Sequence, residues 1–137
     1  MSDQKSRTEI VEVFFDDLDS FGVLHHAKYA MILERGVLSH FAKIGLALGH
    51  ADLNNFVREL SITYESPVAG MGPVELTFWI EKLGRTSSVI AFRIHSGETL
   101  HAYGRRVTVK FDPRTRKPAP WTDSTRHLIE EEFLMKQ

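Results

Sequence analysis

Three aspartates lie within four positions of one another early in the chain, and a pair of histidines follows them. The carboxylates belong to Asp16, Asp17 and Asp19, and the imidazoles to His25 and His26. An isolated aspartate has a pKa of about 3.9, so near pH 7 it is ionised and can act as a nucleophile or a general base. Full burial would raise that pKa by as much as about 3–5 units, so a working aspartate must be partly wet or hydrogen-bonded by backbone amides. The alternative is that all three are solvated acids that favour turns.

A long helix is predicted directly after the histidines, from residue 27 to residue 44. Its apolar residues recur at three- and four-residue steps, which is typical of an amphipathic helix that packs one face on a core. These residues are Ala30, Leu33, Val37, Phe41 and Ile44. Gly45 can end the helix in the left-handed conformation. No Ser, Thr, Asp or Asn stands beside Ala27 to cap the first amides, so these donors are predicted to find another acceptor, such as an anionic ligand or reaction centre.

The length and composition narrow the classes of protein. A chain of 137 residues suits one domain, and we expect a structured core at about 8–112 followed by a tail at 113–137. The absence of cysteine excludes disulfides, thiolate catalysis and cysteine-bound zinc. The sequence has no apolar run of membrane-spanning length, and its N-terminal residues lack the apolar stretch of a signal peptide. We therefore expect a cytoplasmic protein without membrane insertion.

The charges are balanced overall but unevenly distributed. Lys plus Arg number 17 and Asp plus Glu number 18, which gives no general reason to expect nucleic acid as a partner. Residues 1–19 carry six acidic and two basic side chains, whereas residues 105–117 carry six basic and one acidic. The basic segment could meet a phosphorylated small molecule; a solvated strand and loop is the alternative.

The pattern elsewhere predicts five strands and a closing helix. Residues 8–15 are rich in β-branched and aromatic residues, as strands are. In four later segments apolar residues alternate with other residues, which predicts strands with one apolar face. The apolar positions are Leu60, Ile62 and Tyr64; Val74, Leu76, Phe78 and Ile80; Ile90, Phe92 and Ile94; and Val107, Val109 and Phe111. Short turns between them predict a mostly antiparallel sheet with the long helix on one face, and a short helix at 124–134.

Such a sheet leaves edge strands and part of its surface uncovered. Self-association by edge pairing, or by docking of sheet and helix faces across a two-fold axis, is the simplest way to cover them. We therefore expect a homodimer, or a homotetramer built as a dimer of dimers.

The first motif, together with this order of elements, resembles the hotdog fold in its 4-hydroxybenzoyl-CoA thioesterase-like family. The residues that match the family's opening motif are Phe15, Asp17-Leu18-Asp19, Gly22-Val23-Leu24, His26 and Tyr29, with Glu34 further along the helix. Weaker matches are Tyr64-Glu65-Ser66-Pro67 and Gly84-Arg85-Thr86-Ser87-Ser88. The resemblance covers about residues 8–112. It implies an α+β hotdog fold, in which an antiparallel sheet of about five strands wraps one long central helix.

The resemblance implies hydrolysis of an acyl-CoA thioester. The family's catalytic carboxylate falls on Asp19, which would act either as nucleophile or as general base. His26 matches the position whose backbone amide donates to the carbonyl oxygen and whose imidazole assists in the histidine-bearing branch. Glu34 matches a helix glutamate that is the catalytic carboxylate in a related branch, although a surface partner for Lys or Arg is the alternative.

The resemblance also implies a set of substrate contacts. Arg85, Thr86 and Ser87 match a turn that can contact the phosphates of CoA, and arginine suits bidentate phosphate binding. A plain polar hairpin is the alternative. Gly22 and Tyr29 are expected beside the substrate, and Phe21 and Met71 are further candidates to line its pocket. No cofactor is implied beyond the CoA of the substrate. A metal site is not expected, because the chain has no His-x-x-x-His pattern.

Two departures from the family and two other functions stay open. The chain has Gly70-Met71-Gly72 where the family commonly has Gly-Asp, and the adjacent histidines leave open which imidazole faces the substrate. A non-catalytic acyl-CoA-binding module would need no Asp19. A hotdog dehydratase acting on acyl-carrier protein usually carries its histidine in a proline-containing loop, and no proline occurs before Pro67.

Overall fold

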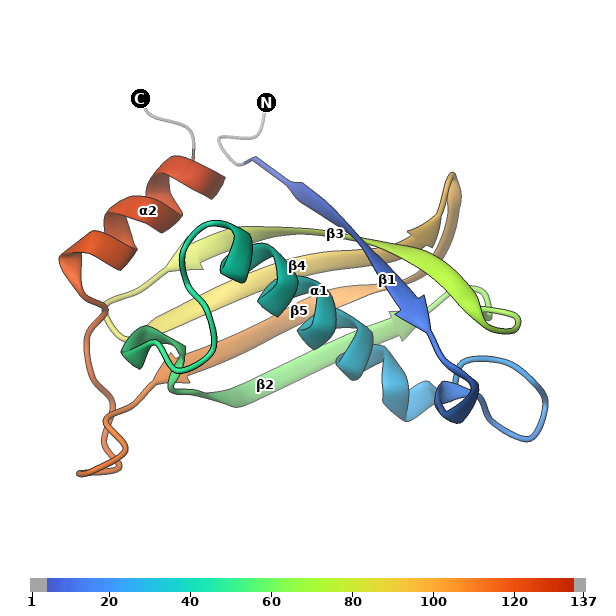
Figure 1. The fold of residues 1–137 in the computed structure, drawn as a ribbon, viewed down its shortest axis with the longest axis horizontal. Helices are drawn as coiled ribbons and strands as arrows, with labels where there is room; N and C mark the ends of the chain where they lie inside the picture. The colour runs from blue at the N-terminus through green and yellow to red at the C-terminus, as the bar shows by residue number, and fades with distance from the viewer. Residues whose placement is uncertain (1–4, 135–137) are drawn as a thin grey trace.

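The computed structural model describes residues 5–134 and consists of one antiparallel sheet, a long helix across its face and a short helix at one end (Figure 1). The strands are β1 (Arg7–Val13), β2 (Asn55–Tyr64), β3 (Gly72–Leu83), β4 (Ser87–Ser96) and β5 (Thr99–Lys110), and the helices are α1 (Tyr29–Lys43) and α2 (Asp123–Phe133). The order across the sheet is β1-β3-β4-β5-β2. This is the architecture that the sequence predicts. No helix within residues 5–134 is long and apolar enough to cross a membrane.

The centre of the sheet is formed by β3 and β4, whose alternating apolar residues pair across the strands. Phe78 lies opposite Phe92, and Ile80 lies opposite Ile90. All four side chains are buried beneath α1. Because side chains of a strand alternate between faces, the same register leaves Trp79 and its neighbours on the outer face. The predicted apolar faces of these two strands are therefore confirmed.

The inner face of β5 is polar at one end. Arg106 lies opposite Ile90, and Thr108 lies opposite Ser88, so both point to the face that α1 covers. Both are buried. The predicted apolar face with Val107 and Val109 is consequently the other face of the strand, away from the helix.

The first strand and the first helix both differ in detail from the sequence prediction. β1 ends at Val13, so Phe14 and Phe15 lie outside it and are exposed. The predicted helix start at residue 27 is a 3-10 turn, and α1 begins at Tyr29. Gly36 also lies on the buried face of α1. A Cβ on this residue would lie 2.3 Å from Leu76 Cδ2, so glycine lets the helix approach the sheet closely here. A close approach of helix and sheet thus replaces part of the expected apolar stripe.

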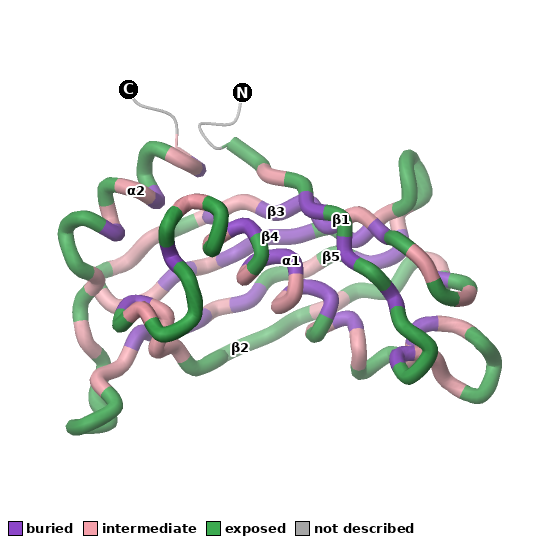
Figure 2. Tube along the Cα trace, viewed as in Figure 1, coloured by how far each residue is buried: buried purple, intermediate pink, exposed green. Residues whose placement is uncertain are grey.

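The edge strand β2 is exposed along almost its whole length, as Figure 2 shows. Large side chains on this edge remain accessible, among them Phe56, Val57, Leu60 and Tyr64. Natural proteins normally cover or charge such an edge, since its free backbone groups can pair with another strand.

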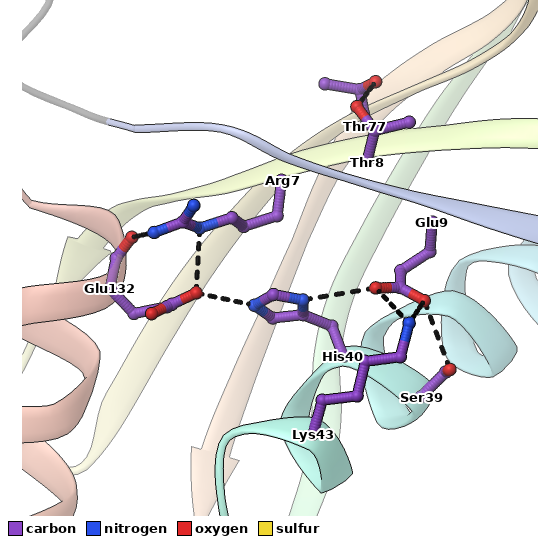
Figure 3. Close-up of polar contacts among 8 residues, drawn as sticks. All are labelled: Arg7, Thr8, Glu9, Ser39, His40, Lys43, Thr77 and Glu132. Carbon is purple, nitrogen blue, oxygen red and sulfur yellow. Dashed lines mark hydrogen bonds and ion pairs between the residues drawn. The ribbon is translucent and has the colours of Figure 1, made fainter.

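A buried ion network fastens α2 to β1 and α1 (Figure 3). His40 Nδ1 lies 3.3 Å from Glu9 Oε2, and His40 Nε2 lies 3.0 Å from Glu132 Oε1. Arg7 also reaches Glu132, with Nε 2.9 Å from Oε1, and Lys43 lies 2.7 Å from Glu9. The two ring nitrogens of His40 thus connect Glu9 on β1 with Glu132 on α2.

Candidate active site

A short hairpin places Asp19 immediately before the helix. Leu18 and Leu24 face each other across an antiparallel bridge, and the Asp19 N–H donates to the Val23 carbonyl at 2.8 Å. The turn closes when the Gly22 N–H donates to the Asp19 carbonyl at 3.0 Å. Gly22 has a φ of +78°, a conformation that is costly for residues with a Cβ. The turn therefore favours glycine at this position, and contact of Gly22 with the substrate stays a prediction.

The Asp19 carboxylate is half-buried and is held by backbone amides. Its Oδ1 accepts hydrogen bonds from the N–H groups of Phe21 at 2.8 Å and Val23 at 3.3 Å. Within the described part of the chain, no group donates to Oδ2. One carboxylate oxygen is thus fixed in place, while the other is available for a reaction.

Asp17 has a different environment, although it lies only two residues away. Its side chain is buried and accepts two hydrogen bonds from the Arg35 guanidinium, at 2.8 and 3.0 Å. A further hydrogen bond comes from the Phe14 N–H at 2.9 Å. The Arg35 hydrogen bond, working against burial, lowers the pKa of Asp17 to about 2. Asp17 is therefore a structural carboxylate, and Asp16 is exposed at the surface.

The start of the helix is capped by a residue that the sequence prediction did not consider. His25 Nδ1 accepts a hydrogen bond from the Ala27 N–H at 3.0 Å, so the expectation of an uncapped start is wrong at this amide. Among residues 5–134, no acceptor binds the N–H of His26. The His26 ring is exposed and stacks on the His25 ring with centroids 4.4 Å apart. The amide and the imidazole of His26 both remain available.

Two tyrosines connect this helix start with the end of β2. The Tyr64 hydroxyl donates to the His26 carbonyl at 2.9 Å, and the Tyr64 ring meets Tyr29 edge to face at 4.9 Å. Tyr29 is buried, and burial raises the pKa of its hydroxyl, to which the nearby charge of Asp19 adds. Tyr64 was not among the predicted site residues, although it opens the second matched motif.

The turn between β2 and β3 lies against the Asp19 hairpin. The Gly70 N–H donates to the Gly22 carbonyl at 2.9 Å, and Val23 bridges Ala69. Phe21 and Met71, the sequence neighbours of these two glycines, are 88% and 64% exposed. Within one chain, therefore, these two candidate pocket residues face solvent.

Glu34 lies further along α1 and pairs with Arg106, with Oε1 2.8 Å from Nη1. The glutamate side chain is 46% exposed, whereas the arginine side chain is 9% exposed. The sequence left a basic surface partner open as the alternative for Glu34. A basic partner is present, but it comes from the inner face of β5. One signal in the sequence could have indicated that Arg106 belongs to a polar face. Arg106, Thr108 and Lys110 are spaced by two residues and alternate with Val107 and Val109.

The predicted CoA-phosphate contacts Arg85, Thr86 and Ser87 belong to the turn between β3 and β4. This turn lies at the end of the sheet opposite to the loop that precedes α1 (Figure 1). The strand β3 runs from the Gly72 end, beside the Asp19 hairpin, to this turn and has 12 residues. At about 3.4 Å per residue, its length is roughly 35–40 Å. A single chain consequently does not bring this turn to Asp19. Arg85 itself is exposed.

Comparison with known proteins places the chain in a family. The sequence profile of the thioesterase superfamily matches residues 21–102. The match begins two residues after Asp19 and includes α1 and most of the sheet. The acyl-CoA thioester hydrolase YbgC of Escherichia coli is 30% identical over 112 residues, which cover 79% of this chain and 84% of that protein. The chain belongs to the thioesterase superfamily. It is accordingly a thioester hydrolase, the class of enzyme that the opening motif implies.

Solved structures confirm the hotdog fold of this thioesterase. A Pseudomonas aeruginosa protein assigned as a thioesterase matches with a TM-score of 0.80 and 26% identity, covering 89% of this chain and 96% of that one. A Staphylococcus aureus protein solved in complex with CoA matches with a TM-score of 0.82 and 18% identity, covering 96% of this chain and 86% of that one.

Proposed function

We propose that this thioesterase hydrolyses an acyl- or aroyl-CoA ester to a carboxylic acid and free CoA, with Asp19 as the catalytic carboxylate. The observation that carries the proposal is the arrangement at the helix start, where, among residues 5–134, no group donates to one oxygen of Asp19 and no acceptor binds the N–H of His26. The name of the Escherichia coli relative and the CoA complex of the Staphylococcus aureus neighbour support a CoA ester as substrate.

The reaction follows from these groups. Asp19 attacks the thioester carbonyl carbon or removes a proton from an attacking water, and the C–S bond breaks as CoA leaves as a thiolate that then takes up a proton. In the first case a mixed anhydride forms, and water hydrolyses it. In both cases negative charge develops on the carbonyl oxygen, where the N–H of His26 can donate. One such donor is worth about 10²–10³ in rate.

The proposed active enzyme is a homodimer, alone or within a homotetramer. The strand β3, which is roughly 35–40 Å long, separates the Asp19 hairpin from the Arg85 turn, so one substrate can meet both only if they come from different copies. Antiparallel pairing of two β2 edges across a two-fold axis would reverse the second sheet relative to the first. The Arg85 turn of one subunit would then lie toward the start of α1 in the other.

A hydrolysis screen tests the proposed activity. Release of the CoA thiol is followed with a thiol reagent for aromatic, short-chain and long-chain acyl-CoA esters, at equal enzyme concentration. We expect at least one class to reach a kcat/KM of about 10⁴ M⁻¹s⁻¹ or more. Tight binding of CoA esters without thiol release in any class would instead identify a binding module.

A further inference from the structure

A cavity lies between α1, α2 and the inner face of the sheet. Its volume is about 110 Å³, and its apolar wall includes Val37, Phe41, Ile80, Ile90 and Ile129. An apolar cavity of about 150 Å³ accepts a benzene ring, so this space suits a group of similar or slightly smaller size.

One wall of the cavity carries a donor without an acceptor. Arg106 lines the space, and only 9% of its side chain is exposed. Its Nη1 pairs with Glu34, but its buried Nε has no hydrogen-bond partner among the described residues. A buried polar group left unpaired normally costs stability, so natural proteins usually pair it with protein, water or ligand.

The charges around this donor define the kind of group that fits it. Glu34 already balances the charge of Arg106, and Lys110 forms an ion pair with Asp52 at the same end of the strand. The Nε–H therefore lacks an acceptor rather than a counter-ion. Asn55, also on the cavity wall, has a buried Oδ1 to which no group of the described residues donates. A neutral group such as a hydroxyl can both accept and donate a hydrogen bond.

The position of the cavity agrees with a role in substrate binding. In a symmetric antiparallel pairing centred on β2 (Asn55–Tyr64), Tyr64 of one subunit lies opposite Asn55 of the other. Tyr64 contacts the His26 carbonyl at the helix start, and Asn55 lines the cavity. The cavity of one copy would then adjoin the Asp19 site of the second copy.

We propose that this cavity is the acyl subsite and that Arg106 determines specificity for compact acyl groups that carry a neutral hydrogen-bond acceptor, such as a hydroxyl. This inference rests on the proposed thioesterase function. The acyl group displaces solvent from the apolar wall, and its terminal oxygen accepts the hydrogen bond of the Arg106 Nε–H. Acyl groups of the same size without that oxygen leave the donor unpaired.

Binding of two small probes tests the subsite without any chemistry. Phenol and toluene have similar shapes, and methyl-labelled protein reports their binding through shifts of Val37, Ile80 and Ile90, with exposed Ile10 as the reference methyl. We expect the wild type to bind phenol about tenfold more tightly than toluene after correction for their different hydration. A charge-assisted hydrogen bond is strong enough for such a ratio. Equal affinities, or shifts confined to other methyl groups, would overturn the proposal.

Two substitutions isolate the Nε–H from the charge of Arg106. Arg106→Lys keeps a cation for Glu34 but lacks the guanidinium, and Arg106→Met also removes the charge. Both should bring the phenol-to-toluene ratio close to one. Arg105→Met is the matched control, because Arg105 is the exposed neighbour and pairs with Glu81 on the outer face. Should a variant at Arg106 retain the wild-type ratio, the proposal is wrong; Arg106→Lys keeps this test available if Arg106→Met does not fold.

Kinetics with pentanoyl-CoA and 5-hydroxypentanoyl-CoA connect the subsite to catalysis. The wild type should prefer the hydroxylated ester in kcat/KM by roughly tenfold, and Arg106→Lys should lose this preference while it still hydrolyses pentanoyl-CoA. Hydrolysis of both esters with no preference would contradict the subsite but leave the thioesterase function intact. Probe selectivity that depends on Arg106 in a protein without hydrolysis would contradict the function but leave the subsite intact.

Discussion

The carboxylate of Asp17 is clamped by the guanidinium of Arg35 through two hydrogen bonds, at 2.8 and 3.0 Å. Asp19, two residues later, receives hydrogen bonds only from backbone N–H groups and keeps one oxygen free within the described residues. The two aspartates of one short motif thus have different environments. Asp17 joins the loop to α1, whereas Asp19 is the carboxylate that we propose for catalysis.

Asp17→Asn should lower the free energy of unfolding by about 2–3 kcal/mol, because the amide leaves the Arg35 guanidinium without its buried carboxylate partner. Chemical denaturation with urea measures this change. Asp16→Asn is the control, since Asp16 is exposed, and it should change the stability by less than about 0.5 kcal/mol. Equal stability of the two variants would refute the structural role of Asp17.

The same pair predicts the acid stability of the protein. The pKa of Asp17 falls from 3.8 to about 2 on folding, so its contribution is fully present above pH 4 and is lost as the pH falls toward 2. A shift of this size corresponds to about 2 kcal/mol. Asp52 has a second lowered pKa. Burial is the largest single effect and would raise it, but the hydrogen bonds from Lys110 and Thr122 together outweigh burial and lower the pKa of Asp52 to about 2. Asp17→Asn removes only the contribution of Asp17. Urea midpoints between pH 6 and pH 2 should therefore drop less steeply in Asp17→Asn than in the wild type.

Arg85→Ala should raise KM for CoA esters roughly ten- to a hundredfold and change kcat little. A phosphate contact far from the reacting carbonyl is present in both the ground state and the transition state, so its loss weakens binding uniformly. Arg93→Ala, on the outer face of the sheet, is the control and should leave both constants unchanged. An unaltered KM in Arg85→Ala would mean that the turn is a plain polar hairpin.

Wild-type protein at micromolar concentration should sediment as a dimer or larger. Leu60→Lys places a charge at the middle of the exposed β2 edge and should shift the population toward monomer. Ile10→Lys, which alters an exposed residue on β1 at the opposite edge, should leave the assembly intact. A well-folded wild-type monomer would contradict the proposed assembly.

His40→Gln should loosen α2, because a glutamine side chain cannot contact Glu9 and Glu132 from two sides as the two ring nitrogens of His40 do (Figure 3). Hydrogen exchange of residues 123–133 should become about tenfold faster or more. His127→Gln changes an exposed histidine on α2 and should leave the exchange unaltered. If both variants exchange alike, the buried network does not fasten the helix.

The fold was predictable because its central strands follow a simple rule. Apolar residues alternate along β3 and β4, and all of the predicted positions from Val74 to Ile80 are buried. The limits of β1 and α1 were less predictable. Phe14 and Phe15 have strand-forming side chains, but Asp17 draws the Phe14 N–H into a turn instead. Propensity gave way here to a specific hydrogen bond.

The candidate site was predictable only where its residues are close in sequence. Asp19, Gly22 and His26 lie on one hairpin and the helix that follows it, so a local motif contains their arrangement. Arg106 meets Glu34 across 72 positions, and nothing local in the sequence indicates that contact. The same holds for Tyr64, which reaches the His26 carbonyl across 38 positions.

The turnover of Asp19→Asn is the most direct test of the account. The amide keeps the shape of the side chain and removes the charge, so kcat with the best acyl-CoA ester should fall by at least about a hundredfold while the ester still binds. Asp16→Asn, measured in parallel, should retain a kcat within a few-fold of the wild type. A kcat for Asp19→Asn within a few-fold of the wild type would contradict the assignment and make Glu34 the carboxylate to test next.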